Sequence, residues 1–160
     1  QSQVVRTRAR LNAVVQASLM LIRHHLALND VKLETELIEG DDTLTCDASQ
    51  LEQALVALMI NAVEAMKTTP TRVLGVKLGA SGDKLDLRIS DTGVGIPPEA
   101  MGHIFEPFFS TKEAEGGVGL GLAVVYGIMQ SHGFTIEGES EPGKGTTFHL
   151  KLARQPAVQG

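Results

Sequence analysis

Several residue types are scarce or missing in this sequence of 160 residues: it has no tryptophan, one tyrosine and one cysteine. The lone Cys46 has no partner for an internal disulfide, which favours a reducing, cytoplasmic setting. The longest apolar run, residues 54–60, is far shorter than the ~20 residues that span a bilayer, and no secretory signal pattern is visible. With so few aromatic residues, the core has to be built from leucine, valine, isoleucine, alanine and methionine.

The charge balance is acidic, with 14 lysines and arginines against 19 aspartates and glutamates and a net charge of −5. A nucleic-acid partner would need a basic face, so no nucleic-acid partner is expected. A phosphate ligand is not excluded, because backbone N–H groups can hold one without net positive charge. With 42% hydrophobic and 21% charged residues, the composition is typical of one folded domain.

Hydrophobic periodicity predicts the order of the secondary-structure elements. Helices are predicted over residues 9–28, 48–66 and 120–132, with a short helix before residue 104. Strands are predicted over residues 31–38, 43–46, 72–79, 84–90, 134–139 and 145–152, the first of them half-buried. Residues 105–118 lack clean periodicity. Mixed strands with helices grouped between them predict an α/β two-layer sandwich in which helices cover one face of the sheet.

One polar side chain falls on the apolar face of helix 48–66. At 100° per residue, Ala54, Leu58, Asn61 and Ala65 lie within about 60° of one another. A buried amide without hydrogen-bond partners costs about 1–3 kcal/mol, so something must bind it. Asn61 is therefore bonded to a neighbouring loop, or its carbonyl oxygen meets a hard cation such as Mg²⁺, which takes oxygen ligands.

A second candidate feature lies where strand 84–90 ends. Asp91 follows the strand, and Gly93 and Gly95 come after it at a spacing of two residues. Glycines allow positive φ and a close approach of a ligand, and a carboxylate accepts hydrogen bonds from an exocyclic amino group such as that of adenine. The alternative interpretation is an ordinary Asx turn after a strand.

The third feature is a glycine-rich segment that precedes and enters helix 120–132, with glycines at positions 116, 117, 119 and 121. A glycine-rich loop that leads into a helix N-terminus favours phosphate, because free N–H groups and the helix dipole both attract anions. No Gly-Lys-Ser/Thr follows, so this is not a P-loop, and it follows no strand, so it is not a good Rossmann fingerprint. A flexible hinge is the alternative.

These features, taken in order with the segment Ile104-Phe105-Glu106-Pro107-Phe108-Phe109-Ser110-Thr111-Lys112, resemble a known family. The chain resembles the catalytic ATP-binding domain of sensor histidine kinases, in the superfamily of the gyrase, Hsp90 and MutL ATPases. Asn61-Ala62 resembles the N box, residues 91–96 and 117–122 the two glycine boxes, residues 105–112 the F box, and residues 145–148 the terminal Gly-Thr-x-Phe strand. The match covers roughly residues 12–152. It implies a Bergerat-type ATP-binding fold with a mixed, mostly antiparallel sheet.

The resemblance also implies roles for individual residues, with ATP and Mg²⁺ as the ligands. Asn61 would hold the metal, Asp91 would accept a hydrogen bond from the adenine amino group, and Thr146 would support Asp91 through water. Residues 105–118 would form a mobile lid over the ATP. The nucleotide-binding residues would be Asn61, Asp91, Gly93, Gly95, Ile96, Phe105, Gly117, Gly119, Leu120, Gly121, Leu122 and Thr146. Asn61 and Lys112 would be catalytic, although a solvated surface role for Lys112 is an equal alternative.

The implied activity is transfer of the ATP γ-phosphate to a histidine on a separate dimerisation domain of a homodimeric parent protein, with a response-regulator receiver domain as the next partner. Residues 1–10 would be the end of the dimerisation helix or a linker, residues 11–153 the catalytic domain, and residues 154–160 a tail. The paired His24 and His25 are expected to be surface residues of the first helix rather than phosphoacceptors.

Two positions depart from the family pattern. Ala57 stands where many members carry Asn or Glu, and in the gyrase-like ATPases the Glu activates water, so hydrolysis by that route is not expected. Glu64 stands where many relatives carry a phosphate-binding lysine, so its carboxylate must point away from the phosphates or carry a water to the metal. A serine kinase of the same superfamily, or an ATP-binding module without turnover, are the alternative functions.

Overall fold

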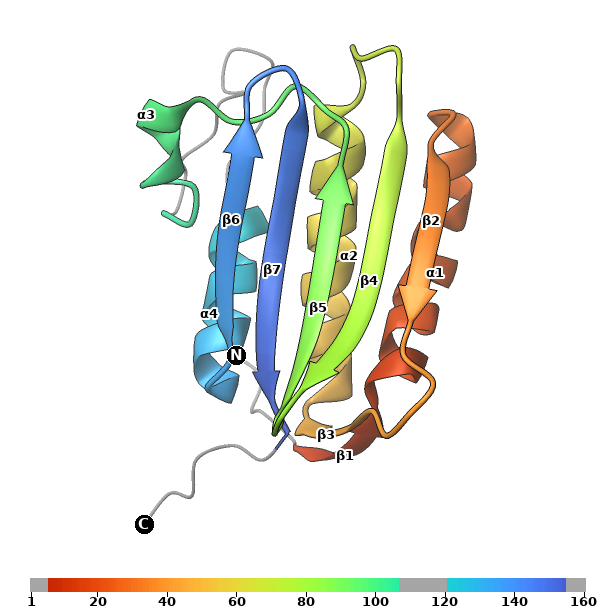
Figure 1. Ribbon diagram of the computed structural model, residues 1–160, viewed down its shortest axis with the longest axis vertical. Coiled ribbons are helices and arrows are strands. Elements are labelled where there is room, and N and C mark those ends of the chain that lie inside the picture. The colour runs from red at the N-terminus through yellow and green to blue at the C-terminus, as the bar shows by residue number, and fades with distance from the viewer. Residues whose placement is uncertain (1–5, 107–120, 155–160) are drawn as a thin grey trace.

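The structure is a computed structural model that describes residues 6–106 and 121–154. Its elements follow the order β1 (Thr7–Arg10), α1 (Leu11–Leu28), β2 (Lys32–Leu37), β3 (Thr43–Cys46), α2 (Ala48–Ala65), β4 (Val73–Ser81), β5 (Lys84–Asp91), α3 (Pro98–Met101), α4 (Gly121–His132), β6 (Thr135–Glu141) and β7 (Gly145–Ala153). A five-stranded sheet has the order β2-β4-β5-β7-β6, and β1 pairs with β3 in a small second sheet (Figure 1).

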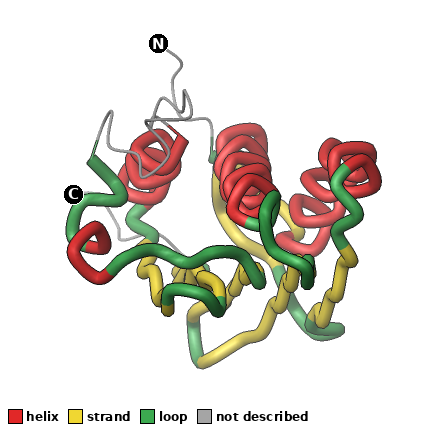
Figure 2. The backbone as a smooth tube through the Cα atoms, turned by 90° about the horizontal axis from the view of Figure 1, so that it is seen from above, coloured by secondary structure: helices red, strands yellow, loops and turns green. Residues whose placement is uncertain are grey.

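The architecture is the predicted two-layer sandwich. In the large sheet β2 and β4 are parallel, whereas the other neighbouring strands are antiparallel. Helices α1, α2 and α4 lie together on one face of this sheet, and the opposite face is open (Figure 2). Within the described residues, no helix is long and apolar enough to cross a membrane.

The core lies between the sheet and the three long helices. Strands β5 and β7 turn every second side chain toward the helices, because side chains alternate between the two faces of a strand. The inward residues below Asp91 and Thr146 are apolar and nearly fully buried: Leu85, Leu87 and Ile89 on β5, and Phe148, Leu150 and Leu152 on β7. The outward residues of the same strands are exposed or half-buried.

The start of the first helix differs from the prediction. Residues 9 and 10 were expected to be helical, but they belong to β1, Thr7–Arg10. Helix α1 begins at Leu11 because Asp42 caps it: the Asp42 carbonyl accepts from Leu11 N–H at 2.9 Å and its carboxylate accepts from Asn12 N–H at 2.7 Å. This cap comes from a residue about thirty positions away, which local periodicity does not reveal.

Two further expectations need correction. Strand β2 forms where predicted, but it is exposed along most of its length rather than half-buried. It is an edge strand, with β4 as its one neighbour in the sheet. Arg154, the first residue of the predicted tail, is anchored: its N–H donates to the Asp83 carbonyl at 3.0 Å and its guanidinium pairs with Asp41 at 3.2 Å.

Candidate functional site

Asp91 lies at the end of β5 on the inner face of the sheet, with 7% of its surface exposed. Its Oδ1 accepts a hydrogen bond from Gly93 N–H at 2.8 Å, which closes an Asx turn. The turn that was the alternative interpretation is therefore present. This turn uses one of the hydrogen bonds that the Asp91 carboxylate can accept, since its two oxygens offer about four lone-pair directions in total.

The glycine segment after Asp91 is packed between two other backbone segments. A side chain on Gly93 would place its Cβ 2.5 Å from the Ala65 carbonyl oxygen at the end of α2. Gly95 has φ +79°, and its Cβ would lie 2.4 Å from the Glu141 carbonyl oxygen. Glycine is required at both positions by the protein's own backbone, a structural reason that the sequence had not indicated.

Hydrogen bonds hold this segment from both sides. Val94 N–H donates to the Ala65 carbonyl at 2.9 Å, and Gly143 N–H donates to the Val94 carbonyl at 2.8 Å. The end of α2 and the β6–β7 turn are thus both hydrogen-bonded to the turn that follows Asp91. Ile96, at the end of the segment, is half-buried against the core.

Asn61 lies on α2 one helical turn before Ala65, so it shares a face with the residue that contacts the glycine segment. Its side chain is half-buried and makes no hydrogen bond to another described residue. Of its stripe, Ala54 and Leu58 are fully buried. A half-buried carbonyl oxygen on this face fits a hard cation such as Mg²⁺, which prefers oxygen ligands and retains several waters. Within residues 6–106 and 121–154 no cluster of three acidic, His or Cys side chains could hold a metal.

Both positions that depart from the family pattern, Ala57 and Glu64, lie on α2 and have local packing or ion-pair partners. Ala57, one turn before Asn61, is partly buried and packs against the hydrophobic core. The Glu64 carboxylate pairs with the Lys67 ammonium at 3.2 Å, so its charge is offset by a residue just beyond the end of α2. It thus makes the local ion pair of a partly exposed residue.

Thr146 lies directly opposite Asp91, because β5 and β7 pair in that register. Its side chain is buried, and its Oγ1 lies 2.8 Å from Ser140 Oγ. Ser140 was missed by the sequence interpretation. It also accepts from Ile96 N–H at 2.7 Å, so it joins β6, β7 and the glycine segment. The available signal was its inward position on β6, where the pattern of Ile136 calls for an apolar residue.

The remaining predicted residues fall into two groups. Phe105 stacks on Tyr126 of α4, with ring centroids 5.2 Å apart, and lies tilted against Phe148 at 6.2 Å. Leu122 packs partly buried against the core near the start of α4, and Gly121 begins that helix. The predicted residues Lys112, Gly117, Gly119 and Leu120 lie outside the described residues.

The histidines take no part in this site. His24 is exposed on α1 as expected, but His25 is half-buried and its Nε2 is enclosed. His149 pairs with Asp86, and His103 pairs with Glu106. His132 is buried at the end of α4, where its Nε2 accepts a hydrogen bond from Asp47 N–H at 3.0 Å. Asp47 also caps α2 by accepting from Gln50 N–H.

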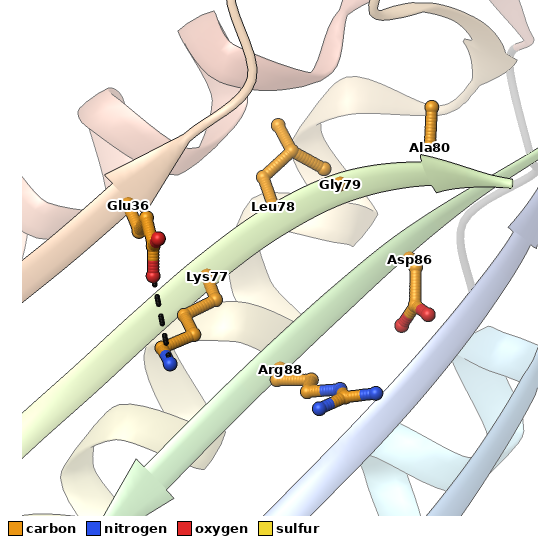
Figure 3. A pocket seen from close by; sticks show the side chains of 7 residues that line it. All are labelled: Glu36, Lys77, Leu78, Gly79, Ala80, Asp86 and Arg88. Atoms are coloured by element: carbon orange, nitrogen blue, oxygen red, sulfur yellow. Dashed lines mark ion pairs between the residues drawn. The ribbon is translucent and has the colours of Figure 1, made fainter.

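A hollow of about 310 Å³ lies on the open face of the sheet, away from Asp91 and Thr146. Figure 3 shows the side chains around it, among them the ion pair of Glu36 with Lys77 and the neighbouring Asp86 and Arg88. These residues project from the face opposite the helices, since they alternate with the buried residues of β4 and β5. The hollow therefore belongs to a different surface from the candidate site.

Comparison with known proteins supports the resemblance. The family described as histidine kinase-, DNA gyrase B- and HSP90-like ATPase matches residues 46–156. The chain is 38% identical to the sensor kinase CckA of Brucella abortus over 88% of its own length and 16% of CckA, and 39% identical to the sensor histidine kinase ZraS of Escherichia coli over 89% of its own length and 35% of ZraS. It thus spans only a minor part of each relative.

Solved structures agree on the fold. The catalytic domain of the histidine kinase ThkA has a TM-score of 0.82 and 26% identity, covering 95% of this chain and 99% of that domain. ThkA in complex with the response regulator protein TrrA has a TM-score of 0.81 and 23% identity, covering 98% of this chain and 44% of that one. The chain accordingly belongs to the family of histidine kinase-, DNA gyrase B- and HSP90-like ATPases.

Proposed function

We propose that the chain is the Mg-ATP-binding catalytic domain of a sensor histidine kinase. It would pass the γ-phosphate of ATP to a histidine on a separate dimerisation domain. The observation that supports the proposal is that the end of α2, the helix that carries Asn61, contacts the turn after Asp91, and that Thr146 lies opposite Asp91 in the sheet. The hydrogen bond from Val94 N–H to the Ala65 carbonyl brings the end of α2 to the end of β5, and strand register sets Thr146 beside Asp91.

The orientation of the nucleotide follows from the chemistry of these side chains. Asp91 and Thr146 offer acceptor oxygens in a buried position, which suits the amino group of adenine. Asn61, on the same face of α2 as Ala65, would hold the Mg²⁺ that accompanies ATP. When bound, the metal would neutralise charge on the transferred phosphoryl group.

The phosphate end of the site would be completed by the start of α4. Gly121 begins this helix, and a helix N-terminus attracts phosphate through its free N–H groups and its dipole. Figure 1 shows the end of β5, the end of α2 and the start of α4 directed toward the same end of the molecule. Gly117, Gly119, Leu120 and Lys112 would contribute from the segment between Phe105 and α4. Phe105 would fix the start of that segment through its stacking on Tyr126.

Phosphotransfer is favoured over hydrolysis by the residue one turn before Asn61. Ala57 packs against the core and offers no carboxylate to activate a water. A histidine nucleophile needs less activation than a water molecule, because imidazole is itself a good nucleophile. The chain would thus depend on positioning and charge neutralisation for its rate, as phosphoryl transfer generally does.

The partners are proposed from the relatives. CckA and ZraS are sensor kinases, and ThkA has been seen with a response regulator. By analogy, the parent protein would be a homodimer that carries the acceptor histidine and would pass its phosphate to a receiver domain. Residues 11–153 would be the catalytic unit, working in the cytoplasm, where the single free Cys46 stays reduced.

A phosphotransfer assay tests the proposal. The chain is mixed with [γ-³²P]ATP, Mg²⁺ and a dimerisation-domain fragment of its parent protein. Label on the fragment that is acid-labile and base-stable is expected. Acid-stable label would indicate a serine kinase instead, and ATP binding without label would indicate a binding module.

A further inference from the structure

Ser140 sits at the junction of three segments of the candidate site. Its Oγ accepts from Ile96 N–H at 2.7 Å, lies 3.0 Å from the Gly145 carbonyl oxygen, and lies 2.8 Å from Thr146 Oγ1. Ser140 itself is half-buried on the inner side of β6, and Thr146 beside it is buried. The hydroxyl is therefore held in one position by partners on three sides.

Counting hydrogens settles which atom donates in each contact. A serine or threonine hydroxyl has one hydrogen and two acceptor lone pairs. The Gly145 carbonyl has no hydrogen, so its contact is a hydrogen bond only if Ser140 donates to it. Ser140 then has no hydrogen left for Thr146, and Thr146 must donate to Ser140. This is the one assignment that places a hydrogen in all three contacts, because the hydrogen of the third comes from Ile96.

The consequence concerns the face that Thr146 presents to a ligand. Its single hydrogen is committed to Ser140, so toward a bound base Thr146 offers lone pairs only. Asp91, its neighbour across the β5–β7 pair, is likewise an acceptor. Both oxygens thus suit a donor and repel an acceptor where they contact the base directly.

We propose that Ser140 is a positioning residue that sets nucleobase selectivity by orienting the Thr146 hydroxyl. The inference rests on the proposed function, in which Asp91 and Thr146 meet the base. Adenine carries an amino group at its 6-position, which donates. Hypoxanthine and guanine carry a carbonyl oxygen there, which would face two acceptors. Because of Ser140, Thr146 as well as Asp91 would disfavour hypoxanthine and guanine relative to adenine.

The test compares ATP with inosine triphosphate, in which a carbonyl replaces the 6-amino group. Dissociation constants of both Mg-nucleotides are measured by calorimetry on the 160-residue chain and on Ser140→Ala. Without Ser140, the Thr146 hydroxyl can turn its hydrogen toward the carbonyl of the inosine base. The ratio of the dissociation constant for inosine triphosphate to that for ATP is expected to fall about tenfold, which corresponds to the free energy of about one hydrogen bond.

Three further single variants and one double variant separate this role from a merely structural one. Ser140→Thr keeps the hydroxyl and should retain the wild-type ratio. Ser90→Ala removes a serine from the outward side of β5 and should also retain it. Thr146→Val removes the hydroxyl and should lower the ratio by itself, and adding Ser140→Ala to it should produce no further change, because Ser140 acts through Thr146.

Each outcome is decisive for a different claim. If Ser140→Ala weakens both nucleotides equally, Ser140 merely holds Ile96 and the inference is overturned. A further drop of the ratio when Ser140→Ala is added to Thr146→Val would also overturn it. Should Ser140→Ala fail to fold, the Thr146→Val ratio decides, since an unchanged ratio there refutes the inference. A wild-type chain that binds no ATP overturns the proposed function itself, and the inference with it.

Discussion

Replacing Asp91 by asparagine separates the local turn from the binding of a base. Asparagine keeps an oxygen where Oδ1 accepts from Gly93 N–H at 2.8 Å, so the Asx turn can form unchanged. The other carboxylate oxygen becomes an amide NH₂, which donates. The free energy of unfolding should therefore fall by no more than about 1–3 kcal/mol, the cost of one buried polar group left unsatisfied.

The effect on ATP should be much larger. With only 7% of its surface exposed, Asp91 has little access to water that would replace a lost bond. A hydrogen bond to a charged group contributes about 1.5–3 kcal/mol, and each 1.4 kcal/mol is a factor of ten. Calorimetry should then show ATP binding weakened about 10- to 150-fold in Asp91→Asn.

A matched control lies on the same strand. Asp86 projects from the open face of β5, where it pairs with His149, so Asp86→Asn makes the same chemical change away from the site. Its ATP affinity should stay within about twofold of the wild type. Unchanged ATP affinity in Asp91→Asn would refute the assignment of Asp91 to the base, and equal weakening in both variants would mean that the effect is transmitted through the sheet.

Three other predictions concern packing and cysteine chemistry. Gly95→Ala should lower the free energy of unfolding by about 2 kcal/mol or more in denaturant titrations, because φ is +79° and the new Cβ would lie 2.4 Å from the Glu141 carbonyl. Gly79→Ala, with no atom within 4 Å of its Cβ, should change it by less than about 1 kcal/mol. Leu55→Ala, at a fully buried position, should cost about 2–5 kcal/mol in the same titration. Burial raises the pKa of the Cys46 thiol to about 11, which keeps the thiol protonated and unreactive at pH 8. Ellman's reagent at pH 8 should therefore react at least about 100-fold more slowly with the native chain than with the chain unfolded in guanidinium. Equal rates for the two would contradict this prediction.

The elements were predictable from periodicity where one side of an element is buried. Helix 48–66 and the strand pair 72–79 and 84–90 match α2 and the β4–β5 hairpin within about two residues. Prediction failed where a distant residue decides the outcome. β1 exists because Thr7–Arg10 finds β3 as its partner, and α1 starts late because Asp42 caps it.

The candidate site shows the same division. Asn61 could be singled out because it is a polar residue on the apolar face of a helix. Asp91 could be singled out because it is a carboxylate at the end of a strand, followed by two glycines. Ser140 was missed: its inward position on β6 was a weak signal, since a single serine near a turn is ordinary in sequence. Its importance comes from Ile96, Gly145 and Thr146, which surround it only after β6 and β7 pair and the glycine segment packs against their turn.

The sequence by itself determined the class of fold, the order of the elements and the motifs that resemble a histidine kinase catalytic domain, because periodicity and motif spacing are local properties of the chain. The tertiary structure alone decided that Gly93 and Gly95 are required by neighbouring backbone and that the Ser140 hydroxyl accepts from Ile96 N–H. These depend on contacts between segments far apart in sequence. Steric exclusion and the direction of a hydrogen bond are set by where the partner atoms lie, and only the folded chain specifies that.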